Sequence, residues 1–272
     1  MEVNDITELL YILSNHKIII FGAGYVATRF YGALKKYEIE KNVVSFATTT
    51  GSYLDIDGIS IIPMNQLESN EQMIICVAVH DSIKDAIIAD LINKGIKNFI
   101  WIYPFLYKLL LGAPIYCNKK VTLSKIWNAA REDYGMAIRY LAIDNYYGKN
   151  INGYKCYKKY LSLFNSDETS ERRLIQFIEL IKSWEQNGYD TSKCSSLYED
   201  YRIFDGAHRI AVASYFNQGF VMCNIFNKTK NLAEIHNQGA ILEKQYALDA
   251  GFEPELIDIL DATNQRIEEQ YK

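Results

Sequence analysis

Residues Lys17–Gly24 have the sequence KIIIFGAG, which decides the fold class of the first part of the chain. The apolar run KIIIF is long enough for a buried strand, and the two glycines after it suit a tight turn. Residues Tyr25–Tyr37 then place apolar side chains at helical spacing. A strand, a glycine turn and a helix in this order predict an α/β unit.

Three further apolar runs follow at the spacing of an alternating α/β unit. They are Val43–Ala47, Met73–Val79 and Phe99–Ile102, and Ser82–Lys94 has a helical pattern between the last two. Alternation of this kind predicts a parallel sheet with helices on its faces. We therefore expect a Rossmann-like domain over residues 1–112.

The dipeptide Asp57-Gly58 favours a hairpin turn between the short runs Ser52–Leu54 and Ile59–Ile62. We expect this hairpin to be an excursion from the sheet. The chain would then return to the sheet in the next parallel strand.

Composition and charge limit the classes of function. The chain has 272 residues, of which 49% are hydrophobic and 23% charged, which predicts a folded protein of two domains. The net charge of −4 gives no overall attraction to nucleic acid or to an anionic membrane. The five cysteines are scattered without a CxxC pair, which favours reduced thiols over disulfides or a zinc site. The first residues, MEVNDITELLYILSNHK, lack a signal-peptide pattern, so we expect a cytoplasmic protein.

One apolar stretch, Phe99–Cys117, raises the question of a membrane segment. Lys108 lies at its centre, and Pro104 and Pro114 interrupt it. We therefore predict a buried strand that runs into a helix, and no membrane span.

From Val121 to Phe164 the pattern changes to helical segments rich in tyrosine and lysine, and we expect a helical connector over residues 113–165. Seven tyrosines lie between Tyr134 and Tyr160. This group suits recognition of a sugar-like or polyol-like substrate, because tyrosine offers a flat apolar face with a hydroxyl and lysine offers charge. Helix packing between the two domains explains the same residues, so both interpretations stay open.

A second strand, turn and helix occur late in the chain. Tyr201–Phe204 favours a strand, Asp205-Gly206 a turn, and Ala207–Phe216 a packed helix. Phe220–Phe226 favours a further strand.

The tail Leu232–Tyr271 has helical periodicity in two pieces. With the strands and the helix before it, this tail completes the last part of the chain. We expect residues 166–272 to form a mixed α+β domain.

The first glycine turn suits a dinucleotide. In Gly22-x-Gly24-x-x-Ala27 the first glycine permits the tight turn, the second lets a pyrophosphate approach the backbone, and Ala27 lets the helix pack close to the strand. These three are the candidate cofactor-binding residues, for NAD(P). An NAD site places an acidic residue after the second strand, whereas this chain has Thr48–Thr50 with no arginine beside them. A structural or substrate-positioning role without a nucleotide therefore stays open.

His80 and Asp81 follow the strand Met73–Val79, at the edge where open α/β sheets bind their ligands. They form a candidate site pair. The alternative is that Asp81 or Ser82 caps the following helix.

Residues 17–102 resemble the Rossmann-like domains of bacterial surface-glycan biosynthesis proteins. The resemblance rests on the FGAG turn, the helix after it, and the segment Lys94–Ile100 with the sequence KGIKNFI. It implies a role in surface-polysaccharide or sugar-precursor biosynthesis. Such domains commonly carry an acidic residue after the second strand, and this chain does not.

The densest cluster of reactive side chains is Asp205-Gly206-Ala207-His208-Arg209. If a helix begins near Ala207, its free N–H groups and positive dipole end lie beside His208 and Arg209 and make a phosphate site. Asp205 would bind a metal, a magnesium ion that bridges the phosphates. In the alternative, Asp205 caps the helix, His208 makes a buried hydrogen bond, and Arg209 pairs with a surface carboxylate.

Residues Glu171–Phe226 resemble the ParB/sulfiredoxin superfamily. Its hallmark is a strand, a Gly-x-x-Arg or Asp-Gly-x-His-Arg turn, and an alanine-rich helix, which Tyr201–Ala213 match with YRIFDGAHRIAVA. The resemblance implies that Gly206, His208 and Arg209 bind the phosphates of a nucleotide.

Two members of that superfamily have features that this chain lacks. Sulfiredoxin carries its reactive cysteine directly before the His-Arg pair, where this chain has Ala207, which argues against sulfinic-acid repair. Partition proteins continue into a basic helix-turn-helix, and the acidic tail after Asn231 does not resemble one. The remaining activity that the resemblance implies is that of a small-molecule kinase.

We therefore expect nucleotide-dependent phosphoryl transfer to a small hydroxyl-bearing metabolite, with ATP or another nucleoside triphosphate and Mg²⁺. The candidate catalytic residues are Asp205, His208 and Glu171, with Glu171 or Glu168 as the base. One alternative is an NAD(P)-dependent sugar oxidoreductase or epimerase centred on Gly22. Another is a nucleotide-sensing protein without turnover, and a homodimer stays open in each case.

Overall fold

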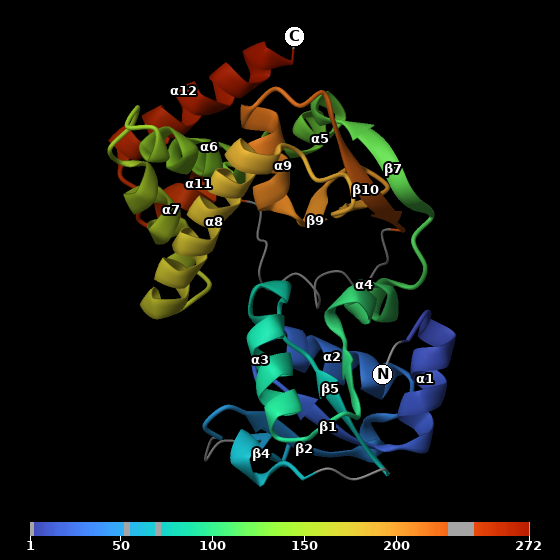
Figure 1. Ribbon diagram of the computed structural model, residues 1–272. Coiled ribbons are helices and arrows are strands. Elements are labelled where there is room, and N and C mark those ends of the chain that lie inside the picture. The colour runs from blue at the N-terminus through green and yellow to red at the C-terminus, as the bar shows by residue number, and fades with distance from the viewer. Residues whose placement is uncertain (1–2, 52–54, 69–71, 228–241, 272) are drawn as a thin grey trace. The chain divides into compact units, whose positions relative to one another are not determined.

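The computed structural model describes residues 3–51, 55–68, 72–227 and 242–271. The chain forms two compact units, Met1–Ala113 and Pro114–Lys272 (Figure 1). The connector was expected over residues 113–165, and its residues 114–165 lie within the second unit.

A six-stranded sheet in the order β3-β4-β2-β1-β5-β6 forms the centre of the first unit. Adjacent strands are parallel except β3 and β4. The strands are β1 (Lys17–Phe21), β2 (Val43–Thr48), β3 (Asp55–Ile56), β4 (Ile59–Pro63), β5 (Met73–Val77) and β6 (Phe99–Trp101).

The hairpin expected at Asp57-Gly58 is confirmed as β3 and β4. The expectation that the hairpin leaves the sheet is wrong, because β4 pairs in parallel with β2 and places Ile61 opposite Phe46. Residues Ser52–Leu54, expected in the same hairpin, lie outside the described residues.

Strand β1 is apolar from Ile18 to Phe21 because both of its faces are buried there. Ile18 and Ile20 belong to the core formed with α1 (Ile6–Asn15), α2 (Tyr25–Lys36) and α4 (Tyr103–Leu111). Ile19 and Phe21 belong to the core on the other face, which α3 (Asp81–Asn93) covers. The turns η1 (Glu40–Asn42) and η2 (Met64–Gln66) complete the unit.

The apolar stretch Phe99–Cys117 is resolved into β6 and α4. Pro104 lies in the first turn of α4, where a proline fits because that backbone N–H has no helical partner. Leu106 and Leu109 are fully buried, so the predicted strand running into a helix is confirmed. Among the described residues, no helix combines the length and the apolar character that crossing a membrane requires.

The second unit contains a four-stranded sheet in the order β7-β10-β8-β9. Strands β8 and β10 are parallel, and the other two pairs are antiparallel, so the sheet is mixed. The strands are β7 (Tyr116–Thr122), β8 (Ser195–Tyr198), β9 (Ile203–Asp205) and β10 (Phe220–Phe226).

Strand β9 begins two residues later than the predicted strand Tyr201–Phe204. The backbone of Tyr201 is left-handed, with φ of 64°, and the amide of Tyr198 donates to Arg202 O at 3.0 Å. Residues 199–202 therefore form the turn of a β8–β9 hairpin.

Seven helices of the described residues complete the second unit. Helix α6 is its central helix, because every residue from Gly135 to Asp144 is buried. An added Cβ at Gly153 would overlap the carbonyl of Leu141, so α6 and α7 cross at close backbone approach. The helices are α5 (Leu123–Ala130), α6 (Gly135–Tyr146), α7 (Gly153–Ser162), α8 (Asp167–Asn187), α9 (Ala207–Tyr215), α11 (Lys244–Asp249) and α12 (Pro254–Gln270).

The α/β class is confirmed, since each unit combines helices with a sheet that contains parallel strands. The predicted helical tail matches α11 and α12 from residue 244 onward, and its residues 232–241 lie outside the described residues.

Candidate functional site

The second glycine turn joins β9 to α9 and requires a glycine for two reasons. Gly206 has φ of 86° and ψ of 17°, a left-handed conformation that side chains disfavour. A Cβ at Gly206 would also lie 2.8 Å from Cβ of Ser195 and 3.0 Å from Nη2 of Arg209. The turn is therefore packed directly against the buried strand β8.

The N-terminus of α9 is open to an acceptor from outside the helix. The N-cap residue is Gly206 and not Asp205, so the N-cap position itself supplies no capping side chain. The first helical hydrogen bond runs from Ile210 N to Gly206 O at 3.0 Å. The amides of the first turn, together with the positive end of the helix dipole, favour an anion there.

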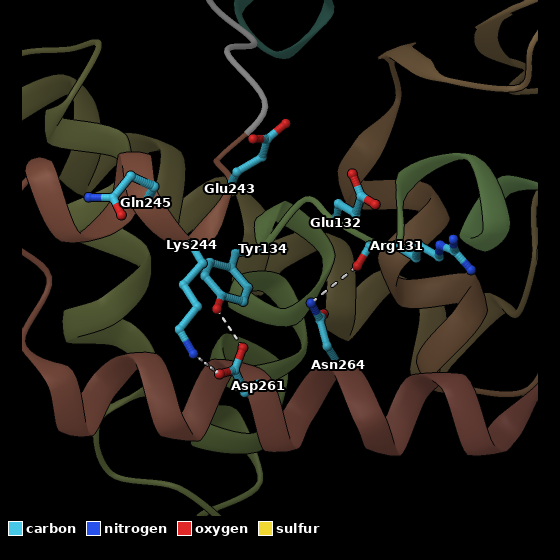
Figure 2. A pocket seen from close by; sticks show the side chains of 8 residues that line it. All are labelled: Arg131, Glu132, Tyr134, Glu243, Lys244, Gln245, Asp261 and Asn264. Carbon is cyan, nitrogen blue, oxygen red and sulfur yellow. Dashed lines mark hydrogen bonds and ion pairs between the residues drawn. The ribbon is translucent and has the colours of Figure 1, made fainter.

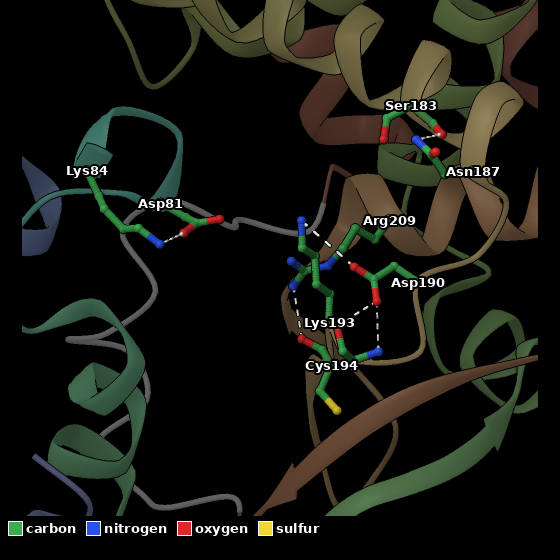
Figure 3. A network of polar contacts seen from close by, with 9 residues as sticks. Asp81, Lys84, Ser183, Asn187, Asp190, Lys193, Cys194 and Arg209 are labelled. Atoms are coloured by element: carbon green, nitrogen blue, oxygen red, sulfur yellow. Dashed lines mark hydrogen bonds and ion pairs between the residues drawn. The ribbon is translucent and has the colours of Figure 1, made fainter. Parts of the chain in front are cut away.

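Arg209 lies beside this helix end, held by one hydrogen bond and a loose ion pair. Its Nη2 donates to Cys194 O at 3.0 Å (Figure 3). The same nitrogen lies 3.8 Å from Oδ2 of Asp205. Within the described structure, its Nε is buried and has no hydrogen-bond partner. The Arg209 side chain is 31% exposed, so the guanidinium is accessible at one edge. A buried polar group without a partner costs about 1–3 kcal/mol.

Two carboxylates are close to this guanidinium. Asp205 is 24% exposed, and Asp190 carries a lowered pKa because the hydroxyl and the amide of Ser192 donate to it, with Lys193 and Arg209 adding positive charge. Mg²⁺ in nucleotide sites is held by one or two carboxylates and the phosphates themselves. Asp205 fits that requirement in chemistry and in exposure. Within the described residues, no group of three or more metal-ligating side chains forms a site independent of a nucleotide.

His208 directs its imidazole into the helical core of the second unit. Its Nε2 lies 2.6 Å from the hydroxyl of Tyr157, and its ring centroid lies 4.8 Å from that of Phe177. Tyr157 is fully buried, and burial raises its pKa to about 12. His208 thus makes a partly buried hydrogen bond, as in the alternative in which it does not bind phosphate. Its ring fixes α9 against α7 and α8.

Glu171 and Glu168 lie on the exposed start of α8. Glu171 forms an ion pair with Lys158 of α7 at 3.0 Å, and both side chains are about half exposed. No hydrogen bond or ion pair of the described residues joins either glutamate to Asp205 or Arg209. The structure therefore groups Asp205, Gly206 and Arg209, whereas the His208 ring contacts Tyr157 and Glu171 pairs with Lys158.

The first glycine turn has a different environment. Gly22 has φ of 125°, and an added Cβ would lie 2.7 Å from the carbonyl oxygen of Ala78 at the end of β5. Ala27 is fully buried and packs against Gly22. Gly24 is exposed, is the N-cap of α2, and has no described atom within 4 Å of its Cβ position. The space in front of Gly24 is therefore open to a ligand.

Aromatic side chains cluster at the ends of β5 and β6 in the same unit. The ring of His80 meets the ring of Tyr103 at 5.0 Å, and Tyr103 stacks on Trp101 at 6.1 Å. Lys84 lies 4.2 Å above the ring of Trp101 and 3.3 Å from Asp81. Asp81 opens α3 and is engaged by Lys84, whereas His80 faces the aromatic group.

The tyrosines of residues 134–160 do not form one surface. Tyr140 and Tyr157 are buried, and the hydroxyls of Tyr146 and Tyr147 donate to Glu185 at 3.0 and 2.6 Å. Helix packing within the second unit accounts for most of them. Tyr134 instead donates to Asp261 at the edge of an open cavity of about 350 Å³, where Lys244 also binds Asp261 (Figure 2).

Several neighbours of these sites have no signal in the sequence. Ser195 begins strand β8 and Cys194 precedes it, and both approach the second turn. The four residues of β8 have no periodicity that distinguishes them from a loop. In the sequence, nothing distinguishes Lys84 from the other lysines, and only the fold of α3 places it over the ring of Trp101. A signal for such contacts exists only in three dimensions.

The sequence matches no model of a known protein family, no curated protein and no solved structure. The geometry of the two turns is therefore the basis for assigning a function.

Proposed function

We propose that this protein binds the phosphates of a nucleoside triphosphate at the N-terminus of α9, and that it transfers a phosphoryl group to a small hydroxyl-bearing metabolite. The observation that carries the proposal is the buried Nε of Arg209, which lacks a partner among the described residues and lies beside a helix end whose N-cap residue, Gly206, has no side chain. Both features favour an anionic acceptor. The proposal places a ParB-like nucleotide site in the second unit.

Each residue of the turn would have a separate task. Gly206 lets the backbone turn so that the first amides of α9 point toward the phosphates. Arg209 supplies a charged donor to the oxygens of the transferred group, where negative charge must be stabilised during the reaction. Asp205 would hold Mg²⁺, which when bound neutralises charge between the phosphates.

The contact with Tyr157 makes His208 a positioning residue in this proposal. Its ring fixes α9, and so keeps Arg209 and the first amides of the helix in place. Glu171 stays a prediction for the base, since its ion pair with Lys158 occupies it in this state of the protein. A role in surface-polysaccharide or sugar-precursor biosynthesis rests on the sequence resemblance alone.

A second candidate is an NAD(P)-dependent sugar oxidoreductase or epimerase in a Rossmann-like first unit. The open space in front of Gly24 favours it, because a pyrophosphate can approach the backbone there. Thr48 Oγ1 accepts a hydrogen bond from Gly51 N at 3.0 Å, so its hydroxyl is committed to the turn after β2. An acidic ribose ligand is missing from that position, which makes this candidate the weaker one.

Thermal-shift measurements with ATP, CTP, NAD and NADP, each with Mg²⁺, distinguish the candidates, because a ligand that binds only the native state raises the melting temperature. The variants are Arg209→Gln, Gly24→Val, and Arg202→Gln as a control. Arg202 forms an ion pair with Asp200 in the β8–β9 turn, so the control removes an equal charge from the same unit.

We expect a nucleoside triphosphate to stabilise the wild type and the control, and Arg209→Gln to weaken its binding about tenfold or more. Release of nucleoside diphosphate in the presence of candidate acceptors then separates a kinase from a nucleotide sensor. The outcome that would contradict the proposal is a rise in melting temperature with NAD or NADP alone that Gly24→Val abolishes and Arg209→Gln does not change. The function would then belong to the first unit.

A further inference from the structure

A second cavity of about 330 Å³ lies between α6 and α12 in the second unit. Leu141, Ile259 and Ala262 give it an apolar wall. Asp144, Lys149 and Arg266 give it a charged wall, and Thr263 and Asn150 also line it. A cavity of this size with an apolar wall and a few fixed polar groups is typical of sites for small molecules.

The charged wall is a continuous chain of hydrogen bonds. Arg266 Nη2 donates to Oδ2 of Asp144 at 2.7 Å, and the hydroxyl of Tyr215 donates to Oδ1 at 2.8 Å. Lys149 Nζ in turn donates to the hydroxyl of Tyr215 at 3.0 Å. Burial raises the pKa of Tyr215, so its hydroxyl keeps the proton that it donates to Asp144.

These contacts orient Lys149 and Arg266 without using all of their N–H donors. Arg266 also lies 5.6 Å from the ring of Tyr140, and Lys149 lies 5.4 Å from the ring of Tyr215. A guanidinium carries five N–H donors and an ammonium carries three. The hydrogen bonds to Asp144 and Tyr215 therefore leave donors on both side chains for a ligand in the cavity.

The charges of this wall do not cancel. Asp144, whose side chain is only 5% exposed, neutralises Arg266, and Lys149 remains as one surplus positive charge. A monoanion balances this surplus, whereas a dianion would bring one uncompensated charge toward the buried Asp144.

We infer that this cavity binds a small carboxylic acid, with the carboxylate between Lys149 and Arg266 and an apolar body against Leu141, Ile259 and Ala262. This site is separate from the proposed nucleotide site: its charged wall is hydrogen-bonded to Tyr215 at the last turn of α9, whereas Arg209 lies in the first turn. The inference does not depend on the proposed function.

The test measures binding of benzoate, benzyl alcohol and inorganic phosphate to the full chain by isothermal titration calorimetry. Benzyl alcohol has the same apolar body without the charge, and phosphate has charge without the apolar body. The informative variant is Lys149→Met, which keeps an unbranched apolar side chain of similar length and leaves the Arg266–Asp144 ion pair intact. The control is Lys155→Met, because Lys155 is an exposed lysine that does not line the cavity.

We expect benzoate to bind more tightly than either probe, and Lys149→Met to weaken benzoate about tenfold, equivalent to ~1.4 kcal/mol. Lys149→Arg should restore most of the affinity, and Lys155→Met should leave it unchanged. Absence of benzoate binding at millimolar concentration would overturn the inference. Equal binding of benzyl alcohol, stronger binding of phosphate, or equal losses in Lys149→Met and Lys155→Met would also overturn it.

Discussion

Each of the two glycine turns joins a strand to a helix, but the atoms packed against the glycine are backbone at the first turn and side chain at the second. At the first turn the obstacle to a side chain is backbone, since the carbonyl oxygen of Ala78 lies 2.7 Å from a Cβ at Gly22. At the second turn the obstacles are side chains, because a Cβ at Gly206 would meet Ser195 and Arg209. A turn confined by backbone is rigid, whereas one confined by polar side chains carries groups that can bind a ligand.

This difference also explains where chemistry is concentrated. The first turn exposes Gly24 with free space but with no charged side chain in the turn itself. The second turn has Asp205 and Arg209 within one helical turn of Gly206, and the Arg209 Nε has no partner among the described residues. The first turn therefore favours a ligand held by backbone, and the second favours one held by charge.

Gly22→Ala should produce the largest loss of stability in this comparison. The new Cβ needs a φ near 125°, which only glycine adopts readily, and it clashes with a backbone atom that cannot rotate away. We expect the first unit to lose about 4 kcal/mol of unfolding free energy. Hydrogen exchange, which reports the two units separately, measures this loss.

The matched control lies in the same turn. Gly24→Ala adds a Cβ to open space, so its cost should stay below about 0.5 kcal/mol. Equal effects of the two substitutions would contradict the assignment of different roles to the two glycines.

Gly206→Ala should cost less, about 3 kcal/mol, and should act on the second unit. A left-handed alanine costs about 1–2 kcal/mol, and the remainder comes from moving the side chains of Ser195 and Arg209. Gly219→Ala serves as the control, because no described atom lies within 4 Å of its Cβ position. A Gly206→Ala protein as stable as the control would show that the Ser195 and Arg209 side chains move away from the new Cβ at little cost.

Tyr157→Phe tests whether side chains on neighbouring helices hold the second turn in place. Removing the hydroxyl takes away the 2.6 Å contact with His208 inside the helical core. We expect the second unit to lose about 1.5 kcal/mol, together with weaker nucleotide binding because α9 is less firmly positioned. Tyr154 is a half-buried tyrosine of the same helix, and Tyr154→Phe should change neither quantity. Loss of stability without any change in nucleotide binding would separate His208 from the proposed site.

The sequence was sufficient for the parts of the fold that depend on local pattern. The run KIIIF predicted β1 because four consecutive apolar residues, Ile18–Phe21, suit a strand that is buried on both faces. Strand β7 was missed because six of its seven residues are not buried, so its Lys- and Asn-containing sequence has no strand pattern. Strand β8 was missed because it is only four residues long.

The candidate site was predictable in the same uneven way. Asp205, Gly206 and Arg209 are close in sequence, and one helical turn brings them together. Cys194 and Ser195 reach the site through long-range pairing of β8, and the contact of His208 with Tyr157 spans 51 residues. Local periodicity does not encode contacts of this kind.

The smallest expected effect concerns Asp190, a carboxylate near Arg209 of the second turn. The Ser192 hydroxyl donates to Oδ1 of Asp190 at 2.6 Å and the Ser192 amide at 2.9 Å, and these bonds lower the pKa of Asp190. Its stabilising contribution is therefore complete above the ordinary aspartate pKa of about 3.9 and is lost as the pH falls through the lower folded value. Ser192→Ala removes one of the two donors, so the Asp190 pKa should rise part of the way back toward its ordinary value.

A carboxyl-carbon NMR titration measures the shift, with Thr191→Ala as the control. An Asp190 pKa unchanged by Ser192→Ala would mean that the Ser192 amide and the nearby cations, Arg209 among them, are sufficient to lower this pKa. The second turn would then resemble the first in depending mainly on backbone.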